Sequence, residues 1–425
     1  MTLASSIPRV GPGARAPLAA FSLTRAHERL LGAVMWIFVA CASIGVIEPS
    51  PYDFASFVAI PLWLFGGFRL HRSFVVLYFL IVAYAFVGFL ALTPYWTDPD
   101  ATIYQYQTAY LAVTALFFAL YVGDRTEARA ELILMGFTVG CVIASAAGQI
   151  GYFDVAGLAK SMATYGRASG TFKDPNVLGS FIILGALYLT QNLLLARARS
   201  ALLSTLILAV LVAGIFLSFS RGSWGATIFS MLFMISAAFA TAKTSRAKTR
   251  ILTIAVVAIG IVAIVVLVLL SFEPIRQLFL QRASPVQEYD GGEAGRFGNQ
   301  LRSLPMLLDR FWGFGPLQFR KTFGLEPHNS YIGAFANAGW MGGLLFILLV
   351  VVTTFVGIRL MFRDSPYQRL AQVFVPALTG FFLQAFQIDV DHWRHVWLMI
   401  GCVWGLEAGR QKWLAAESRK TAEPV

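Results

Sequence analysis

Charged residues are scarce in this 425-residue chain, because Asp, Glu, Lys and Arg make up only 13% of it. An ordinary soluble domain carries about 25% charged residues. So few charges cannot cover a soluble surface of this size, whereas 57% hydrophobic residues and a mean hydropathy of +0.68 suit a chain dissolved in lipid. The net charge is +11. In a membrane chain the location of charges matters more than their sum, so we expect no nucleic-acid partner.

Cysteine and the common catalytic motifs are also missing or rare. Cys41, Cys141 and Cys402 each lie in an apolar run, which excludes a disulfide framework and a cysteine metal site. The sequence has no phosphate-binding loop, dinucleotide fingerprint, Gly-x-Ser-x-Gly turn or His-Glu-x-x-His helix. No cleavable signal peptide is evident in the first 28 residues, so the apolar run that follows is predicted to be a retained helix.

Long apolar runs dominate instead. A spanning helix needs about 20 mostly apolar residues, and the chain predicts an all-α, polytopic membrane helix bundle with about twelve transmembrane helices. The predicted spans are 29–47, 53–68, 74–92, 104–122, 131–151, 177–195, 201–218, 223–242, 251–272, 329–357, 367–388 and 394–411. The predicted parts are a cytoplasmic tail (1–28), spans one to nine (29–272), a large periplasmic loop (273–328), spans ten to twelve (329–411) and a cytoplasmic tail (412–425).

The Lys and Arg residues predict the orientation of these spans. With both termini in the cytoplasm, 21 of the 33 positive residues fall in inside segments, and every inside loop is basic. The short outside loops carry acidic residues instead: Glu48 and Asp53 in one, Asp98 and Asp100 in another. We therefore predict a multi-pass protein of the bacterial inner membrane with cytoplasmic termini.

The other twelve positive residues fall outside, against this rule, and are candidates for function. Arg221 is the most informative, because it lies in a turn of almost no length between two predicted spans. A charge there is costly unless it faces a polar cavity with an anionic partner. Ser220 adds a hydroxyl, and Gly222 permits close approach of the backbone. Several arginines around one cavity suit a pyrophosphate, because guanidinium is a rigid fork that stays charged; the alternative for Arg221 is an interfacial residue that reaches lipid headgroups.

Two further groups of outside residues could carry chemistry. His328 precedes the tenth span, and a histidine can take a proton from a sugar hydroxyl near neutral pH. Asp389-Val-Asp-His-Trp-Arg-His395 joins the last two spans and could be a metal site, a polar network that positions the arginines, or an Asp paired with Arg394. Of these we expect a polar arrangement and no metal.

Four stretches resemble the O-antigen ligase/polymerase superfamily of bacterial membrane glycan transferases. They are Gly166-Arg-Ala-Ser-Gly-Thr-Phe172 with Pro175-Asn176, the turn Ser220-Arg-Gly222, Arg296 followed by Gly313-Phe-Gly-Pro316, and His328-Asn329 followed after nine residues by Gly339-Trp-Met-Gly342. The similar region covers roughly 160–345. The last spacing is fairly specific, whereas the Ser-Arg-Gly turn alone is not.

This resemblance implies glycan transfer from undecaprenyl pyrophosphate to a sugar hydroxyl at the periplasmic face, without metal or cofactor. The acceptor is lipid A-core for a ligase or another repeat unit for a polymerase. The implied catalytic residues are His328, Arg221 and Arg296. The substrate-binding candidates, of which the resemblance makes Arg167 a secondary donor contact, are Arg167, Lys173, Arg302, Asn329, Ser220 and Arg394.

Two alternative functions remain. A polymerase of O-antigen or exopolysaccharide would use the same donor. A polysaccharide transporter or flippase would instead show ionisable residues near span centres and two related halves. Here the outside charges cluster at one face and no duplication is evident, which favours a transferase.

Overall fold

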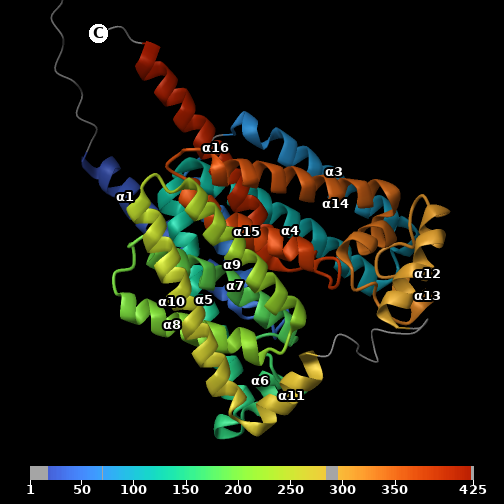
Figure 1. Cartoon of the computed structure of the whole chain (residues 1–425). Helices are drawn as coiled ribbons and strands as arrows, with labels where there is room; N and C mark the ends of the chain where they lie inside the picture. The colour runs from blue at the N-terminus through green and yellow to red at the C-terminus, as the bar shows by residue number, and fades with distance from the viewer. Residues whose placement is uncertain (1–17, 69, 284–294, 423–425) are drawn as a thin grey trace, which may run out of the picture.

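The computed structural model describes residues 18–68, 70–283 and 295–422, and these ranges fold into a helical bundle (Figure 1). The helices are α1 (Leu18–Ala40), α2 (Pro51–Phe65), α3 (Val75–Leu92), α4 (Pro99–Asp124), α5 (Thr126–Tyr152), α6 (Ala159–Met162), α7 (Pro175–Leu194), α8 (Ala201–Leu217), α9 (Arg221–Thr241), α10 (Ser245–Leu270), α11 (Glu273–Ala283), α12 (Arg296–Leu308), α13 (Phe319–Phe323), α14 (Ser330–Phe362), α15 (Gln368–Gln384) and α16 (Arg394–Ala422). Short 3-10 helices are η1 (Cys41–Ser43), η2 (Arg72–Phe74), η3 (Thr93–Tyr95) and η4 (Val155–Gly157). The protein is an all-α, multi-pass membrane protein.

A helix lies at each of the twelve predicted spans: α1 to α5, α7 to α10 and α14 to α16. Eight helices of the described chain are long and apolar enough to cross a membrane. The other four are α2 and α8, which are apolar but have 15 and 17 residues, and α15 and α16. The bundle is therefore as expected, and the number of helices that cross the membrane stays a prediction.

Two helices extend into the predicted tails. Helix α1 begins at Leu18, inside the predicted tail 1–28, and α16 continues to Ala422, through most of 412–425. Hydropathy ends a span at its last apolar residue, whereas a helix continues in water where good helix formers follow. In α16 an i,i+3 ion pair between Lys420 and Glu417, 2.9 Å apart, supports this polar extension.

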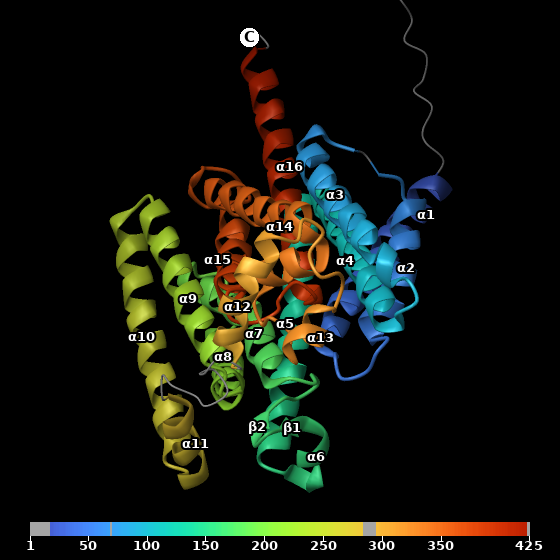
Figure 2. The same cartoon turned by 90° about the vertical axis from the view of Figure 1, so that its right-hand side faces the viewer.

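Burial distinguishes central helices from lipid-facing ones. The apolar window of α7 is 78% buried inside the protein, whereas that of α10 is only 11% buried. Figure 2 accordingly shows α10 at the edge of the bundle. Helix α7 therefore forms the centre, with α5, α8, α9 and α15 packed around it, and α4 and α16 form the most extensive helix pair beside them.

The connections that carry the candidate residues gather at one end. Helices α6 and α11 lie at the end away from the C-terminus (Figures 1 and 2), together with an antiparallel pair of two-residue strands, β1 (Ala163–Thr164) and β2 (Arg167–Ala168). Helices α12 and α13 also lie away from the C-terminus in Figure 1. We call this end the distal face; it comprises residues 153–174, 218–221, 271–283, 295–329 and 385–393. The predicted outside segments 152–176 and 273–328 both contribute to it, although residues 284–294 lie outside the described ranges.

Ion pairs dock α13 onto the start of α4. Lys321 Nζ lies 2.7 Å from Asp98, and Arg320 Nη2 lies 2.7 Å from Asp100. Gln318 also donates to Asp98, at 3.0 Å. These contacts lower the pKa of Asp98 below its ordinary value, with the hydrogen bond from Lys321 as the largest cause. Two of the outside positive residues are thus accounted for by acidic partners of a neighbouring loop.

The predicted orientation can be tested with single cysteines. Tyr165 on the distal face is 86% exposed, and Lys243 at the opposite end has a side chain that is 75% exposed. In spheroplasts we expect a membrane-impermeant maleimide to label Tyr165→Cys at once and Lys243→Cys only after lysis, in a background without the native cysteines. Labelling in the opposite order would overturn the periplasmic placement of the distal face.

Candidate functional site

A buried hydroxyl network fixes the start of α9. The Ser220 side chain caps this helix by accepting a hydrogen bond from the Ser223 backbone N–H, at 3.2 Å. Ser223 Oγ lies 2.9 Å from Ser180 Oγ of α7, and Ser180 in turn donates to Gln384 Oε1 of α15, at 3.0 Å. The predicted substrate-binding residue Ser220 therefore acts on the position of the helix.

The same contacts place Arg221, the first residue of α9, against the end of α15. A Cβ on Gly222 would lie 2.9 Å from the side-chain nitrogen of Gln387 and 3.0 Å from that of Gln384. Only glycine allows this close packing without a shift of the neighbours. Arg221 is half-buried there, as its position in a short turn predicts.

Arg296 reaches the same segment from the large loop. It is the first residue of α12, and its Nη1 donates to the Gln387 carbonyl at 3.0 Å. Its guanidinium also lies 4.8 Å from the ring centre of Phe297, within the range of a cation–π contact. Gln387 is thus contacted by Arg296 and packs against Gly222, the residue that follows Arg221.

His328 and Asn329 are fixed on the other side of this segment by Asp389. His328 Nδ1 lies 3.1 Å from Asp389 Oδ2, and the Asn329 backbone N–H donates to Asp389 Oδ1 at 3.0 Å. The Asn329 side chain caps α14 and donates to the Phe386 carbonyl, so Asn329 is a positioning residue in this structure. His328 has a φ of +47°, which is uncommon outside glycine.

The acidic neighbours change the protonation of His328. Its hydrogen bond to Asp389 raises its pKa above the ordinary value, against burial and the charge of Arg296, which lower it. Glu326, two residues earlier, has a pKa raised to about 7 by burial and by the charge of Asp389. Because the carboxylate accepts from Nδ1–H, Nε2 is left as the basic nitrogen of a neutral His328.

Replacement of Asp389 by Asn should lower the pKa of His328. A group whose pKa is raised by folding contributes stability below its ordinary pKa and loses it as the pH rises through the folded value. We therefore expect diethyl pyrocarbonate, which modifies neutral imidazole, to react with His328 from a lower pH in Asp389→Asn than in the wild type. His71 serves as the control in the same peptide map, and equal profiles for His328 would contradict the assignment.

A second polar cluster lies beside the first. Asp391 is contacted by His392 Nδ1 at 2.9 Å, the Tyr104 hydroxyl at 3.1 Å and Ser330 Oγ at 3.1 Å. His392 Nε2 lies 3.0 Å from the Thr108 hydroxyl. His395 points elsewhere, into a buried aromatic cluster. The described residues hold no group of three or more His, Cys, Asp or Glu side chains that could hold a metal ion.

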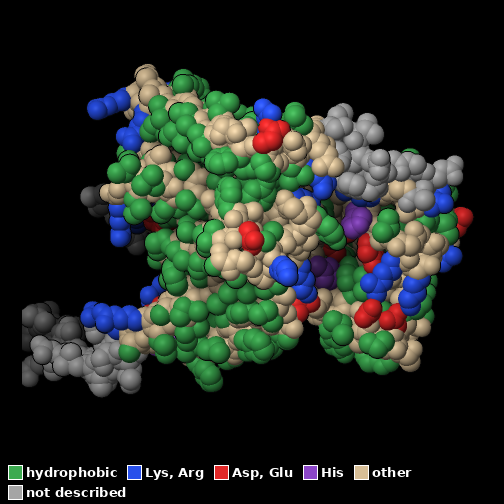
Figure 3. Space-filling view, turned by 90° about the horizontal axis from the view of Figure 1, so that it is seen from below, with side chains coloured by type: hydrophobic (Ala, Val, Ile, Leu, Met, Phe, Trp, Pro, Cys, Tyr) green, Lys and Arg blue, Asp and Glu red, His purple; other side chains and the backbone are tan. Residues whose placement is uncertain are grey.

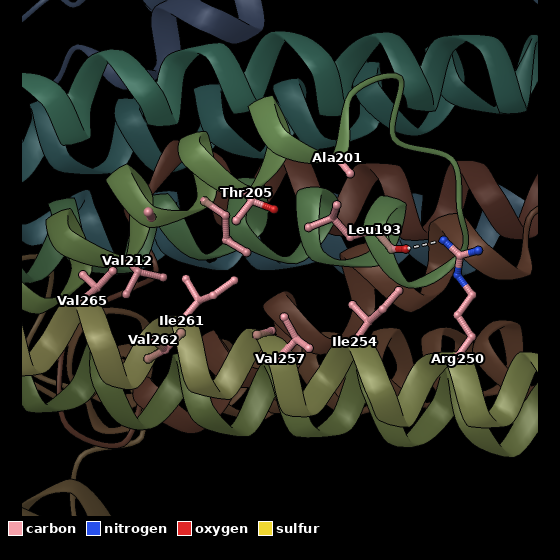
Figure 4. A pocket seen from close by; sticks show the side chains of 13 residues that line it. Leu193, Ala201, Thr205, Val212, Arg250, Ile254, Val257, Ile261, Val262 and Val265 are labelled. Atoms are coloured by element: carbon pink, nitrogen blue, oxygen red, sulfur yellow. Dashed lines mark hydrogen bonds between the residues drawn. The ribbon is translucent and has the colours of Figure 1, made fainter.

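A cavity of about 240 Å³ lies between these clusters. It is lined by Tyr104, Gln107, Leu317, Glu326, Pro327, Gly333, Asn337, Asp389, Asp391 and His392. Figure 3 shows a hollow in which histidine and acidic side chains gather near Lys and Arg side chains. A hollow between α8 and α10 (Figure 4) is different, because only Thr205 and Arg250 among its lining residues are polar. Of these two cavities in the described chain, the first has the groups for acid–base chemistry.

Arg394, a predicted substrate-binding residue, lies in an ion pair within the bundle. Its Nε and Nη2 donate to both oxygens of Asp53, at 2.9 and 2.7 Å. The two side chains are 23% and 14% exposed. Pairing of Arg394 with an Asp of its own connection is one of the alternatives for 389–395, and in the structure Arg394 pairs instead with Asp53 at the start of α2.

The role of this ion pair can be measured as stability. Loss of one partner of a buried pair costs about 3 kcal/mol, so Asp53→Ala should lower the melting temperature in detergent clearly. The exposed pair Lys243–Asp364 is the matched control, because removal of an exposed pair costs at most about 1 kcal/mol. A double variant Asp53→Leu/Arg394→Met that is stable but inactive would instead restore Arg394 to the substrate site.

The remaining predicted binding residues also have partners in the fold. Arg167 is buried and donates to the Ser218 carbonyl and to Asn176 Oδ1, both at 2.8 Å. Lys173 pairs with Glu48 at 3.2 Å. Arg302 donates to Asn299 and lies over Phe323. Arg167 therefore joins the Gly166–Asn176 stretch to the turn before Arg221, which gives this motif a structural role.

Gly313 and Gly339, from the last two motifs, allow the backbones of the 310–315 loop and of α14 to pack closely. A Cβ on Gly339, which breaks α14 with a φ of +64°, would lie 2.2 Å from the Phe311 carbonyl oxygen. A Cβ on Gly313 would lie 2.5 Å from the Phe335 carbonyl oxygen. The Phe314 N–H then donates to the Ala336 carbonyl, at 2.7 Å. These glycines dock the 310–315 loop into the break of α14 at Ala338 and Gly339.

The chain matches no protein-family model and no curated protein sequence. The functional assignment therefore depends on the motif residues and on the geometry described above. Sequence reasoning missed Glu326, Gln384 and Gln387. Gln384 and Gln387 could have been noticed as amides within the apolar range 367–388, whereas Glu326 gave no signal before its position beside Asp389 was known.

Proposed function

We propose that this protein transfers a glycan from undecaprenyl pyrophosphate to a sugar hydroxyl at the periplasmic face of the inner membrane, as an O-antigen ligase does with lipid A-core. One observation carries the proposal. Arg296 donates to the Gln387 carbonyl, Gly222 next to Arg221 packs against the Gln387 side chain, and the His328–Asp389 pair lies two residues further along the same segment. This arrangement supports a site in which two arginines and a general base act on one lipid-anchored pyrophosphate donor.

The arginines act on the leaving group. In the transfer, the acceptor oxygen bonds to the anomeric carbon while the bond from that carbon to the pyrophosphate oxygen breaks. The electron pair stays on undecaprenyl pyrophosphate, and the guanidinium groups of Arg221 and Arg296 stabilise that charge. The start of α9 adds its own positive end, because Arg221 is the first residue of that helix.

His328 acts on the acceptor. Nε2 takes the proton of the attacking hydroxyl, and Asp389, bound to Nδ1, holds the ring orientation and stabilises the imidazolium that forms. General-base assistance of this kind contributes about 10²–10⁴ in rate. The leaving group is already activated as a pyrophosphate ester, so these residues need no metal or nucleotide.

The assigned roles predict distinct losses. In proteoliposomes with undecaprenyl-pyrophosphate glycan and lipid A-core, His328→Ala should slow transfer by about 10²–10⁴. Arg221→Ala and Arg296→Ala should each slow it by about 10²–10³, as expected for loss of one charge-stabilising donor. Chelator should have no effect. Arg310→Ala, a loop arginine that contacts Phe314, is the matched control.

Several outcomes would change the proposal. Wild-type rates in the three variants would refute the assigned roles, and inhibition by chelator would refute the metal-independent chemistry. Elongation of the donor glycan without transfer to lipid A-core would assign polymerase activity. Movement of the lipid-linked glycan across the membrane without a new glycosidic bond would assign a flippase.

A further inference from the structure

The cavity beside His328 differs in charge from the arginine side of the site. Its lining includes three carboxyl groups, Glu326, Asp389 and Asp391, and no Lys or Arg residue of the described chain. Arg221 and Arg296 are not among its lining residues; Arg296 contacts Gln387, against which Gly222, next to Arg221, also packs. Because carboxylates repel phosphate, the cavity disfavours the pyrophosphate donor that the arginines would attract.

The chemistry of the lining suits a sugar. The rings of Tyr104 and His392 lie against each other, with centres 4.0 Å apart and planes tilted by 31°, and Asn337 donates to the Tyr104 hydroxyl at 2.8 Å. The Gln107 side chain makes no hydrogen bond within the described ranges, so both ends of its amide are available to a ligand. Amides, carboxylates and a phenol together offer the donors and acceptors that hydroxyl groups need.

The size and position of the cavity further limit which ligand it can bind. The volume of about 240 Å³ is below the roughly 300–1,000 Å³ of sites for drug-sized ligands, which fits one sugar residue, with the rest of a glycan outside the cavity. Asp389 both lines the cavity and contacts His328 Nδ1. A sugar held there is therefore separated from the proposed base His328 by one residue, Asp389.

We propose that this cavity binds the reacting sugar residue of the acceptor, and that this residue is a neutral or amino sugar without phosphate or carboxylate groups. The inference rests on the proposed glycan transfer and assigns its second substrate to a defined place. Donor and acceptor are then separated by charge: the pyrophosphate lies with the arginines, and the acceptor hydroxyl lies among the carboxylates, with the His328–Asp389 pair between them.

Gly333 offers a test that does not damage the fold. It lies in helix α14 on the cavity wall, and a Cβ there would meet only Pro327 at 3.7 Å and Asn337 at 4.0 Å, both ordinary contact distances. A larger residue would therefore project into the cavity, and in a helix glycine is the weaker former. Gly333→Leu should keep or raise the melting temperature and fill the acceptor space.

The measurement is the initial rate of transfer by full-length protein in proteoliposomes, with undecaprenyl-pyrophosphate glycan and lipid A-core each varied in turn. We expect Gly333→Leu to raise the KM for lipid A-core at least about tenfold, a typical effect of steric mismatch in a pocket, and to leave the KM for the donor unchanged. Gln107→Ala should raise the acceptor KM roughly 3- to 10-fold, as loss of one or two hydrogen bonds predicts. Gly260→Leu is the matched control, because Gly260 lies on α10 with nothing within 4 Å.

The outcomes separate the two proposals. No transfer by the wild type overturns the proposed function and this inference with it. Transfer by the wild type, with unchanged acceptor KM in both variants or with a raised donor KM, overturns the acceptor cavity alone. If Gly333→Leu melts early, Gln107→Ala decides, because its exposed amide supports no other contact in the described chain. Stronger inhibition by free methyl galacturonide than by methyl glucoside would also contradict the acidic acceptor site.

Discussion

One carboxylate, Asp389, joins the parts of the distal face. It binds the side chain of His328 and the backbone of Asn329, and so ties the start of α14 to the connection between α15 and α16. His328 has a left-handed backbone conformation, and its imidazole is held in place by the contact with Asp389. The same group raises the pKa values of His328 and Glu326, so it sets both the geometry and the protonation of its neighbours.

Gln384 and Gln387 perform a comparable task at the end of α15. Gln384 belongs to the hydroxyl network that holds the start of α9, and the Gln387 carbonyl accepts from Arg296. The last residue of α15 thus helps to hold the start of α9, where Arg221 lies, and Gln387, three residues further on, binds Arg296 of the large loop. Polar groups this close to lipid are costly unless every one has a partner. The network therefore favours one arrangement of the distal face.

The sequence predicts the helical class well, since apolar runs of about 20 residues have few other solutions in lipid. It also predicts that Arg221, Arg296, His328 and the 389–395 connection share one face, because charges that oppose the orientation rule point to that face. The sequence does not predict which residues pair with these charged side chains. Arg394 forms an ion pair with Asp53, which lies 341 positions away, and Arg167 donates to the Ser218 backbone carbonyl. Such pairings depend on how the helices pack against one another, and a hydropathy pattern carries no information on that packing.

The docking of Gly313 against Gly339 has a consequence for how such a protein can change over time. A side chain at either position would strike a backbone carbonyl of the other element, and backbone cannot move aside as a side chain can. Replacement of either glycine therefore requires a shift of the backbone in the other element, so we expect the loop and the broken helix to change together or not at all. In the proposed glycan transfer, variation in specificity is then expected at the cavity wall, in residues such as Gln107, and not at these two glycines.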